Sequence, residues 1–360
     1  MYEGKGKRKE FKLLAIALML IFAFTLTGCS SEKQEGNSGD KQQTEQPATG
    51  GSGDLNPSGK KFVIGWSERA LAGTPWFEAM VTAAEELGKA NNCEVVVIDA
   101  QNKPDKQVAD VEDLIARNVD AIVLDPCNPT AILTAVESAN KAGIPVVCVN
   151  SAVDTKDNPN AKIETLITSD NYSIGYGVGY ELGKLWNKDA ANVAIMSGHP
   201  GDMEGWQRRC GFISGFSEYQ YEKFGASEIN VVAQRYAGDW DPDKGMSQMQ
   251  DILVSHPKQI NILFSEGDAM ALGCLNAIKS AGESVLVGSI DGQLEAIEAL
   301  KDGKINAIGI NSAVETGKAG IEYALKVLHD EDISTRVYLP SPTITKDNVD
   351  KFYKPGVPFL

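Results

Sequence analysis

The feature that most constrains the fold is an alternation of short apolar runs, rich in valine and isoleucine, with segments of helical periodicity. Amphipathic segments at 77–92, 107–118 and 131–143 separate the early runs. Runs that are apolar throughout indicate strands covered on both faces, so this part predicts a parallel sheet with helices on each side. The runs occupy residues 61–67, 93–100, 120–126, 144–151 and 161–170.

The pattern begins again near residue 192. A last helix is expected at 314–328, and an extended tail at 336–348. The 360 residues therefore predict an α/β protein with two doubly wound parallel-sheet lobes of similar build. In the second lobe, apolar runs at 192–198, 230–238, 260–268, 284–292 and 305–312 alternate with helical segments at 205–219, 242–256, 269–282 and 293–303.

The first 28 residues have the order of a secretion signal, with a basic start, an apolar run and small residues before a break. Leu26 to Cys29 reads Leu-Thr-Gly-Cys, which resembles a bacterial lipobox, where the chain is cut before the cysteine and the thiol carries lipid. A plain signal peptide with a chance cysteine is the alternative. Residues 30–59 contain one leucine and no aromatic residue, so residues 29–60 are expected to be the lipidated Cys29 and a disordered linker.

The charge of the chain is strongly negative. Loss of residues 1–28 takes five basic and two acidic residues from the formal charge of −15 and leaves −18. No basic patch remains, so nucleic acid is not an expected partner. Five cysteines follow Cys29 without metal-ligand spacing, and we expect buried thiols, with a disulfide left open.

Ligands of such sheets bind beyond the carboxyl ends of the strands. The residues at these positions are rich in side-chain amides and carboxylates, with an arginine and a tryptophan, and they lack a catalytic constellation. A binding protein is therefore expected rather than an enzyme, without a cofactor. The glycines at 175–183 lie within a helix rather than at a strand-to-helix turn, so they do not predict a nucleotide site.

The chain from residue 61 to about 345 resembles the ribose- and galactose-type periplasmic binding proteins, the solute receptors of sugar ABC transporters. The resemblance implies two lobes joined by three crossings near 168–169, 311–312 and 338–341. Lobe 1 is then 61–168 plus 313–338, and lobe 2 is 169–312 plus 339–360. The matching segments, in chain order, include TPWF, DAIVLDPCNPTA, IPVVCVN, GWQRRCGF, GDWDPDKG, EGDAMALG, GSIDG and NSAVETGKAG.

The same resemblance implies the ligand contacts. Trp76 and Phe77 would stack on a sugar from the first lobe and Trp240 from the second, because the C–H faces of sugars pack on aromatic rings. Arg208 would donate to sugar oxygens, Asp291 would accept from adjacent hydroxyls, and Asn311 would do both. Three alternatives stay open: Trp76 and Phe77 could be core, Arg208 and a solvated Arg209 could exchange roles, and Asp291 could be a helix N-cap.

The chain also departs from the family pattern. Thr74 stands where the family has Asn or Asp, Asn150-Ser151 stands where ribose members have an Asp-Arg pair, and Gly267 replaces an asparagine. These changes are expected to remove charge and bulk from the pocket and argue against ribose itself. Glu204 and Asp202 could supply replacement carboxylates. The segment 186–192 is too short for the calcium loop of galactose-type members, so no metal is expected.

The resemblance implies a lipid-anchored receptor on the outer face of a bacterial membrane. It would capture a monosaccharide or polyol by hinge closure and deliver it to an ABC permease, and we expect a monomer. The alternative is a sensor subunit that presents a sugar or signal molecule to a membrane receptor kinase. A secreted enzyme and a sugar-responsive repressor are less favoured, since the chain offers neither a catalytic set nor a DNA-binding helix pair before the domain.

Overall fold

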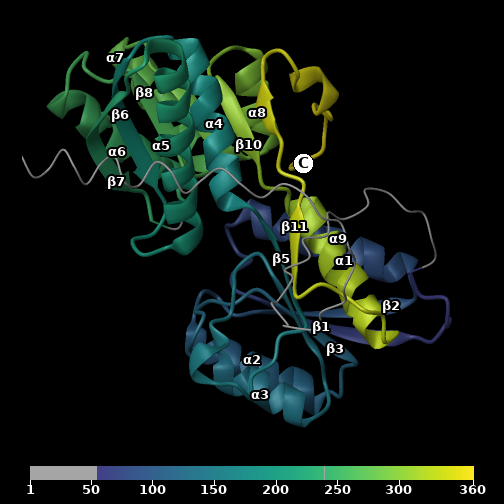
Figure 1. Ribbon diagram of the computed structural model, residues 1–360. Helices are drawn as coiled ribbons and strands as arrows, with labels where there is room; N and C mark the ends of the chain where they lie inside the picture. The colour runs from purple at the N-terminus through teal and green to yellow at the C-terminus, as the bar shows by residue number, and fades with distance from the viewer. Residues whose placement is uncertain (1–54, 239) are drawn as a thin grey trace, which may run out of the picture. The chain divides into compact units, whose positions relative to one another are not determined.

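A computed structural model describes residues 55–238 and 240–360 (Figure 1). The predicted signal peptide, Cys29 and most of the linker lie outside the described residues. The first sheet has the strand order β11-β5-β4-β3-β1-β2, and all of its neighbouring strands are parallel. Its strands are β1 (Phe62–Glu68), β2 (Cys93–Asp99), β3 (Ala121–Leu124), β4 (Val146–Val149), β5 (Thr165–Ser169) and β11 (Arg336–Leu339).

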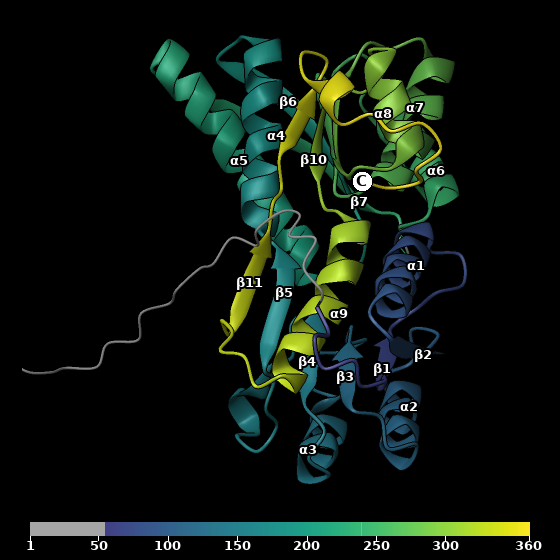
Figure 2. The ribbon, with the colours of Figure 1, turned by 90° about the vertical axis from the view of Figure 1, so that its right-hand side faces the viewer.

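Helices cover both faces of the first sheet (Figure 2). On one face, α1 (Pro75–Ala90) and α9 (Ala313–Leu328) pack with the strands around Trp66. The two helices come close at Gly317, where a Cβ would lie 1.9 Å from the carbonyl oxygen of Met80. On the other face, α2 (Pro104–Ala116) and α3 (Leu133–Lys141) pack on Ile122 and Leu124. The parallel sheet predicted for this half is thus present, with buried apolar runs between two helical layers.

The second sheet has the order β12-β10-β9-β8-β6-β7. Its edge strand β12 is antiparallel to β10, whereas the other neighbours are parallel. The prediction of two α/β lobes with parallel sheets is confirmed, except at β12. This strand follows β11 directly, without the helical crossover that a parallel strand needs. The strands are β6 (Ala190–Ser197), β7 (Glu228–Tyr236), β8 (Ile262–Ser265), β9 (Leu286–Asp291), β10 (Ala307–Ile310) and β12 (Thr343–Thr345).

Two helices in direct backbone contact cover one face of the second sheet. They are α4 (Asn171–Trp186) and α5 (Met203–Phe224), and their apolar side chains pack around Phe212 and Phe264. A Cβ on Gly175 would lie 2.0 Å from the carbonyl oxygen of Arg208, and one on Gly211 would lie 2.0 Å from that of Tyr172. This packing fixes the first turns of α5. On the other face lie α6 (Pro242–Ser255), α7 (Asp268–Ala281) and α8 (Leu294–Lys301).

The chain passes between the two sheets after β5, after β10 and after β11. The last residues return to the second crossing, where Ser312 donates a hydrogen bond to the carbonyl of Leu360 and Phe359 is buried in the first core. Two short 3₁₀ helices complete the described part, η1 (Thr155–Asp157) and η2 (Val349–Lys351).

Residues 55–60, which the prediction placed in the linker, contact the first lobe. Asn56 is buried, and its amide donates to the carbonyls of Lys60 and Asn91, while Leu55 packs on the first core. Residues 55–60 therefore differ from a disordered linker. They have few apolar side chains to bury, and the hydrogen bonds of the Asn56 amide hold them in place instead. Within the described residues, no helix has the length and apolar character needed to cross a membrane. The five described cysteines are free thiols, and Cys93, Cys148 and Cys274 are buried as expected.

Candidate ligand-binding site

A cavity of about 560 Å³ lies at the carboxyl ends of strands from both sheets, within the range of small-molecule sites, about 300–1,000 Å³. The predicted residues that line it are Thr74, Trp76, Phe77, Asn150, Ser151, Glu204, Arg208, Trp240, Asp291 and Asn311. Asp202 lines the cavity too, and the predicted Gly267 does not. Arg69 also lines it, although the sequence pattern did not single it out.

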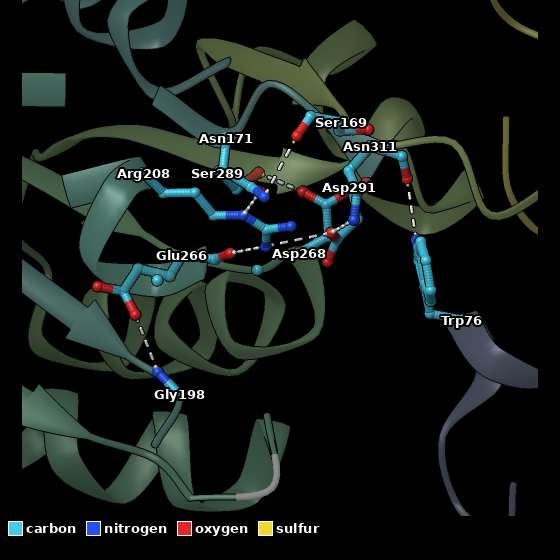
Figure 3. A network of polar contacts seen from close by, with 12 residues as sticks. Trp76, Ser169, Asn171, Gly198, Arg208, Glu266, Asp268, Ser289, Asp291 and Asn311 are labelled. Atoms are coloured by element: carbon cyan, nitrogen blue, oxygen red, sulfur yellow. Dashed lines mark hydrogen bonds and ion pairs between the residues drawn. The ribbon is translucent and has the colours of Figure 1, made fainter. Parts of the chain in front are cut away.

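Trp76 and Phe77 stand at the beginning of α1, directly after Pro75. Trp76 is 9% exposed and packs in the first core, and it also lines the cavity. Its indole nitrogen donates to the carbonyl oxygen of Asn311 at 2.9 Å (Figure 3). The two rings meet at 85° with centroids 5.4 Å apart. Because they are nearly perpendicular, only one of them can lie flat on a given face of a ligand.

Arg208 projects from the first turns of α5 and is 5% exposed. Its Nε donates to Oδ1 of Asn171 at 2.8 Å, and one terminal nitrogen donates to the carbonyl of Glu266 at 2.7 Å (Figure 3). The same nitrogen lies 3.5 Å from Oδ1 of Asp291. The guanidinium is therefore held in one orientation at the cavity wall, beside a carboxylate.

Arg209 does not line the cavity, whereas Arg208 does, so the structure gives no support to an exchange of the two arginines. Arg209 pairs with the buried carboxylate of Glu266 and donates to the hydroxyl of Ser197. Glu266 also accepts from Ser197 at 2.9 Å and from the backbone of Gly198 at 3.2 Å. The expectation of a solvated Arg209 was wrong, because a buried carboxylate at the end of β8 requires a charged partner.

Asp291 ends β9 with a φ of 134°, a backbone conformation that side chains other than glycine rarely adopt. The side chain of Asn311 donates to its Oδ1 at 3.3 Å, which leaves the carboxylate, 18% exposed, between Arg208 and Asn311. Burial raises the pKa of Asp291 to about 6, against the opposing effect of Arg208. Asp291 is not the N-cap of α8, a position that Gln293 takes.

The backbone after Asp291 is held by Asp268, which the sequence analysis missed. Its carboxylate accepts from the backbone of Gly292 at 2.7 Å and of Gln293 at 2.8 Å, and from the hydroxyl of Ser289. Burial and then Asp291 raise its pKa to about 8. An aspartate directly after a buried strand was the available signal. Asp268 thus positions Asp291 rather than facing the cavity.

Trp240 is half-buried, lines the cavity and has a φ of 57°. Its ring lies against two glycines, since a Cβ on Gly198 would be 2.6 Å from its Cε2 and one on Gly267 would be 3.0 Å from its Cε3. The guanidinium carbon of Arg208 lies 5.7 Å from the ring centroid. Gly267 therefore makes room for the Trp240 ring and for Asp291, rather than providing a contact of its own.

The expectation that charge is lost near Asn150 and Ser151 was wrong. The amide of Asn150 donates to Oδ2 of Asp125 at 3.1 Å, and a terminal nitrogen of Arg69 donates to the hydroxyl of Ser151 at 3.3 Å. Asp125, which follows β3, and Arg69, which follows β1, thus lie at the end of β4. They supply there the aspartate and the arginine that the sequence lacks at positions 150 and 151. The guanidinium carbon of Arg69 also lies 5.7 Å from the ring of Phe77.

Two buried carboxylates support Arg69. Glu68 accepts from the indole of Trp66 at 3.0 Å and from the backbone of Arg69 at 3.0 Å. Burial, followed by repulsion from Asp125, raises the pKa of Glu68. Burial also raises the pKa of Asp125 to about 6, while the charge of Arg69 opposes that change. The pair therefore favours a cation at position 69.

Glu204 reaches the cavity from the first turn of α5, close to the helix N-cap Asp202. Burial and then Asp202 raise the pKa of Glu204 to about 7, and a hydrogen bond with Ser151 opposes the rise. Among the described residues, no group of three or more His, Cys, Asp or Glu side chains is arranged to hold a metal ion. The site thus offers aromatic faces, charged hydrogen-bond donors and carboxylate acceptors, which suit a polar, uncharged ligand.

A family model for the periplasmic binding protein domain matches residues 70–332. The ribose import binding protein of Bacillus subtilis is 33% identical over 327 residues, which are 91% of this chain and 97% of that protein. The chain belongs to the ribose-type periplasmic binding protein family. This membership confirms the predicted family and, because the relatives are named as binding proteins, the prediction that this binding protein is not an enzyme.

Other relatives agree with the assignment. The ribose import binding protein of Escherichia coli is 31% identical and covers 73% of this binding protein and 83% of its own length. A solute-binding protein from Actinobacillus succinogenes with bound D-allose superposes with a TM-score of 0.74 at 30% identity, covering 81% of this chain and all of its own. One from Bacillus halodurans with bound myo-inositol has a TM-score of 0.71 at 29% identity, covering 84% and 99%.

Proposed function

We propose that this protein is the solute receptor of an ABC importer and captures a monosaccharide or polyol in the cavity between strand ends of its two sheets. The observation that carries the proposal is the cluster of Arg208, Asp291 and Asn311 beside the ring of Trp240. The names of the relatives support it, since they include ribose import proteins and solute-binding proteins with bound D-allose and myo-inositol.

The chemistry of this cluster fits a sugar. A guanidinium can donate to two oxygens at once, including a ring oxygen that only accepts, and Asp291 accepts from hydroxyl groups. Asn311 supplies one donor and one acceptor. The ring of Trp240 offers an electron-rich face to sugar C–H groups. Hydrogen bonds to charged groups contribute about 1.5–3 kcal/mol each, so loss of either charged residue should abolish most of the affinity.

Closure of the two lobes around the ligand is the mechanism that the chain topology supports. Three crossings connect the sheets, and residues from both line the cavity. A ligand that contacts both sets of strand ends stabilises the closed form by its differential affinity for that form. Delivery to a membrane permease would follow from recognition of the closed form.

We further propose that Cys29 carries a lipid that holds the receptor at the outer face of the cell membrane. The order of the first 29 residues supports this, although they lie outside the described residues. The test is expression of the full chain and of Cys29→Ser with labelled palmitate. Label and membrane association should be present in the first and absent in the second, whereas equal association would contradict lipidation at Cys29.

The receptor proposal is tested by thermal melting of the mature chain with D-ribose, D-allose, xylitol and myo-inositol. A ligand at one hundred times its dissociation constant should add about 2.7 kcal/mol to the free energy of unfolding. We expect a rise in melting temperature with at least one of them, lost in Arg208→Ala and Asp291→Ala. A folded protein that responds to none of these compounds would overturn the proposal.

A further inference from the structure

The end of the cavity formed by the first sheet carries its own arginine, Arg69. This residue follows β1, is half-buried and lines the cavity together with Phe77 and Ser151. Its guanidinium donates to the hydroxyl of Ser151 at 3.3 Å. Among the residues that the structure describes, Ser151 is the acceptor of this guanidinium, so its other N–H groups remain for a ligand.

The backbone of Arg69 is held from three directions. Its N–H donates to the carboxylate of Glu68 at 3.0 Å. Its carbonyl accepts from the backbone N–H of Asn102 at 2.6 Å and from the thiol of Cys127 at 3.6 Å. A long side chain on a backbone fixed in this way loses less freedom when it binds, so Arg69 is preorganised.

The two ends of the cavity repeat one arrangement. At the second-sheet end, Arg208 lies 5.7 Å from the ring of Trp240 and next to the carboxylate of Asp291. At the first-sheet end, Arg69 lies 5.7 Å from the ring of Phe77. Each end thus pairs a guanidinium with an aromatic ring, which can hold a hydroxyl and an adjacent C–H face together.

Carboxylates lie near Arg69, as the carboxylate of Asp291 lies beside Arg208 at the other end of the cavity. Burial disfavours the charge of Arg69, but Asp125, Glu204 and Asp202 outweigh that effect and raise its pKa. Glu204 and Asp202 come from the beginning of α5 in the second lobe and line the same cavity. Their charges compensate the cation at this end, so an anionic sugar gains little from Arg69 and must approach two carboxylates. A neutral ligand meets donors from Arg69 and acceptors from Glu204.

We propose that Arg69 and Ser151 form a second polar subsite that binds hydroxyl groups of the ligand, opposite the cluster of Arg208, Asp291 and Asn311. This inference rests on the proposed sugar-binding function and narrows its ligand class. A ligand that uses both ends needs hydroxyl groups on opposite sides of its ring, and a hexopyranose or a cyclitol carries one or two more hydroxyl groups than a pentopyranose to make these contacts. The subsite therefore selects a neutral hexopyranose or a cyclitol over a pentose, and Arg69 determines that specificity.

Calorimetry on the mature chain tests the subsite with D-ribose, D-allose and myo-inositol as probes. We expect tighter binding of D-allose or myo-inositol than of D-ribose. Arg69→Ala should weaken that binding roughly tenfold to a hundredfold, as expected for hydrogen bonds to a charged group, and should affect D-ribose less. Arg69→Lys, which keeps the charge and loses the planar fork, should be intermediate. The control is Arg117→Ala, at an exposed arginine that caps the C-terminus of α2 and pairs with Asp113, which should leave affinity unchanged.

The outcomes separate the possible failures. If wild type binds none of the probes, the proposed function fails, and the subsite fails with it. If wild type binds a probe and Arg69→Ala binds it equally well, only the subsite is overturned, even if the variant melts at a lower temperature. Preference for D-ribose by wild type overturns it too. If Arg69→Ala does not fold, unchanged affinity and selectivity in Arg69→Lys contradict the subsite.

Discussion

The indole nitrogen of Trp76 lies 2.9 Å from the carbonyl oxygen of Asn311 and donates a hydrogen bond to it. Trp76 begins α1 on the first lobe, and Asn311 follows β10 at the second crossing between the sheets. The bond therefore ties a residue of the cavity wall to the backbone of a crossing segment. A change at Trp76 should alter binding through this bond as well as through the ring.

Trp76→Phe keeps an aromatic ring and removes the donor. The carbonyl of Asn311 then loses its partner, which should cost about 1 kcal/mol and weaken sugar binding several-fold. Calorimetry and urea unfolding measure the two effects. The matched control is Trp186→Phe, because that indole also donates to a backbone carbonyl, of Ala190 at 2.7 Å, but does not line the cavity. Equal loss of affinity in the two variants would refute a specific role for the Trp76 bond.

Asp291→Asn should have opposite effects on stability and on binding. Burial raises the pKa of Asp291 from its ordinary 3.8 to about 6, so the free energy of unfolding falls as pH rises between these two values and stays lower above them. The variant should be more stable than wild type at pH 8 by about 1–3 kcal/mol and equally stable near pH 4, while it binds sugar less well. Asp302→Asn, at an exposed ion pair with Lys304, serves as control with little effect. A destabilised Asp291→Asn at pH 8 would refute the argument.

Glu204 gives a second test of pH dependence. Its pKa in the folded protein is raised to about 7 by burial and Asp202, so the folded state keeps a proton that the unfolded chain loses near its ordinary pKa of 4.5. The free energy of unfolding should therefore fall as pH rises from about 4.5 to about 7, and level off above. Urea unfolding at pH 5, 6, 7 and 8 should show a smaller fall in Glu204→Gln than in wild type. Identical slopes would contradict this assignment.

Gly267→Ala should disturb the site by adding a single methyl group. Its Cβ would lie 3.0 Å from Cε3 of Trp240 and 3.2 Å from Oδ2 of Asp291, so the ring or the carboxylate must shift. We expect roughly tenfold weaker sugar binding, with the melting temperature of the unliganded protein nearly unchanged. Unchanged affinity would show that the site tolerates movement of Trp240.

The sequence predicted the architecture because the central strands are buried on both faces. Runs such as residues 144–149 are apolar throughout, and these central strands have no exposed face to obscure the pattern. The direction of β12 could not be predicted, since only three residues pair and they follow a direct crossing. Short edge strands depend on tertiary context rather than on their own periodicity.

The site residues were predictable where one strand end determines the position, as for Asp291 and Arg208. Arg69 was not, because it lies 82 residues from its partner Ser151, in a loop without periodicity. The pairing of Arg209 with Glu266 could not be predicted from the neighbouring sequence, because it requires that Glu266 is buried. The burial of Glu266 depends on how β6 and β8 pack together. Pairings of charged side chains across strands follow from the folded arrangement and not from local pattern.

Helices α4 and α5 meet at Gly175 and Gly211 with no side chain between their backbones. Two helices in such contact cannot slide or tilt separately without separating, so we expect them to move as one rigid body. Helix α4 begins just after Ser169, where β5 ends and the chain crosses to the second sheet, and α5 carries Arg208 in its first turns. A rotation at that crossing would therefore move the guanidinium that we propose as a ligand contact, because no flexible segment separates it from the two packed helices.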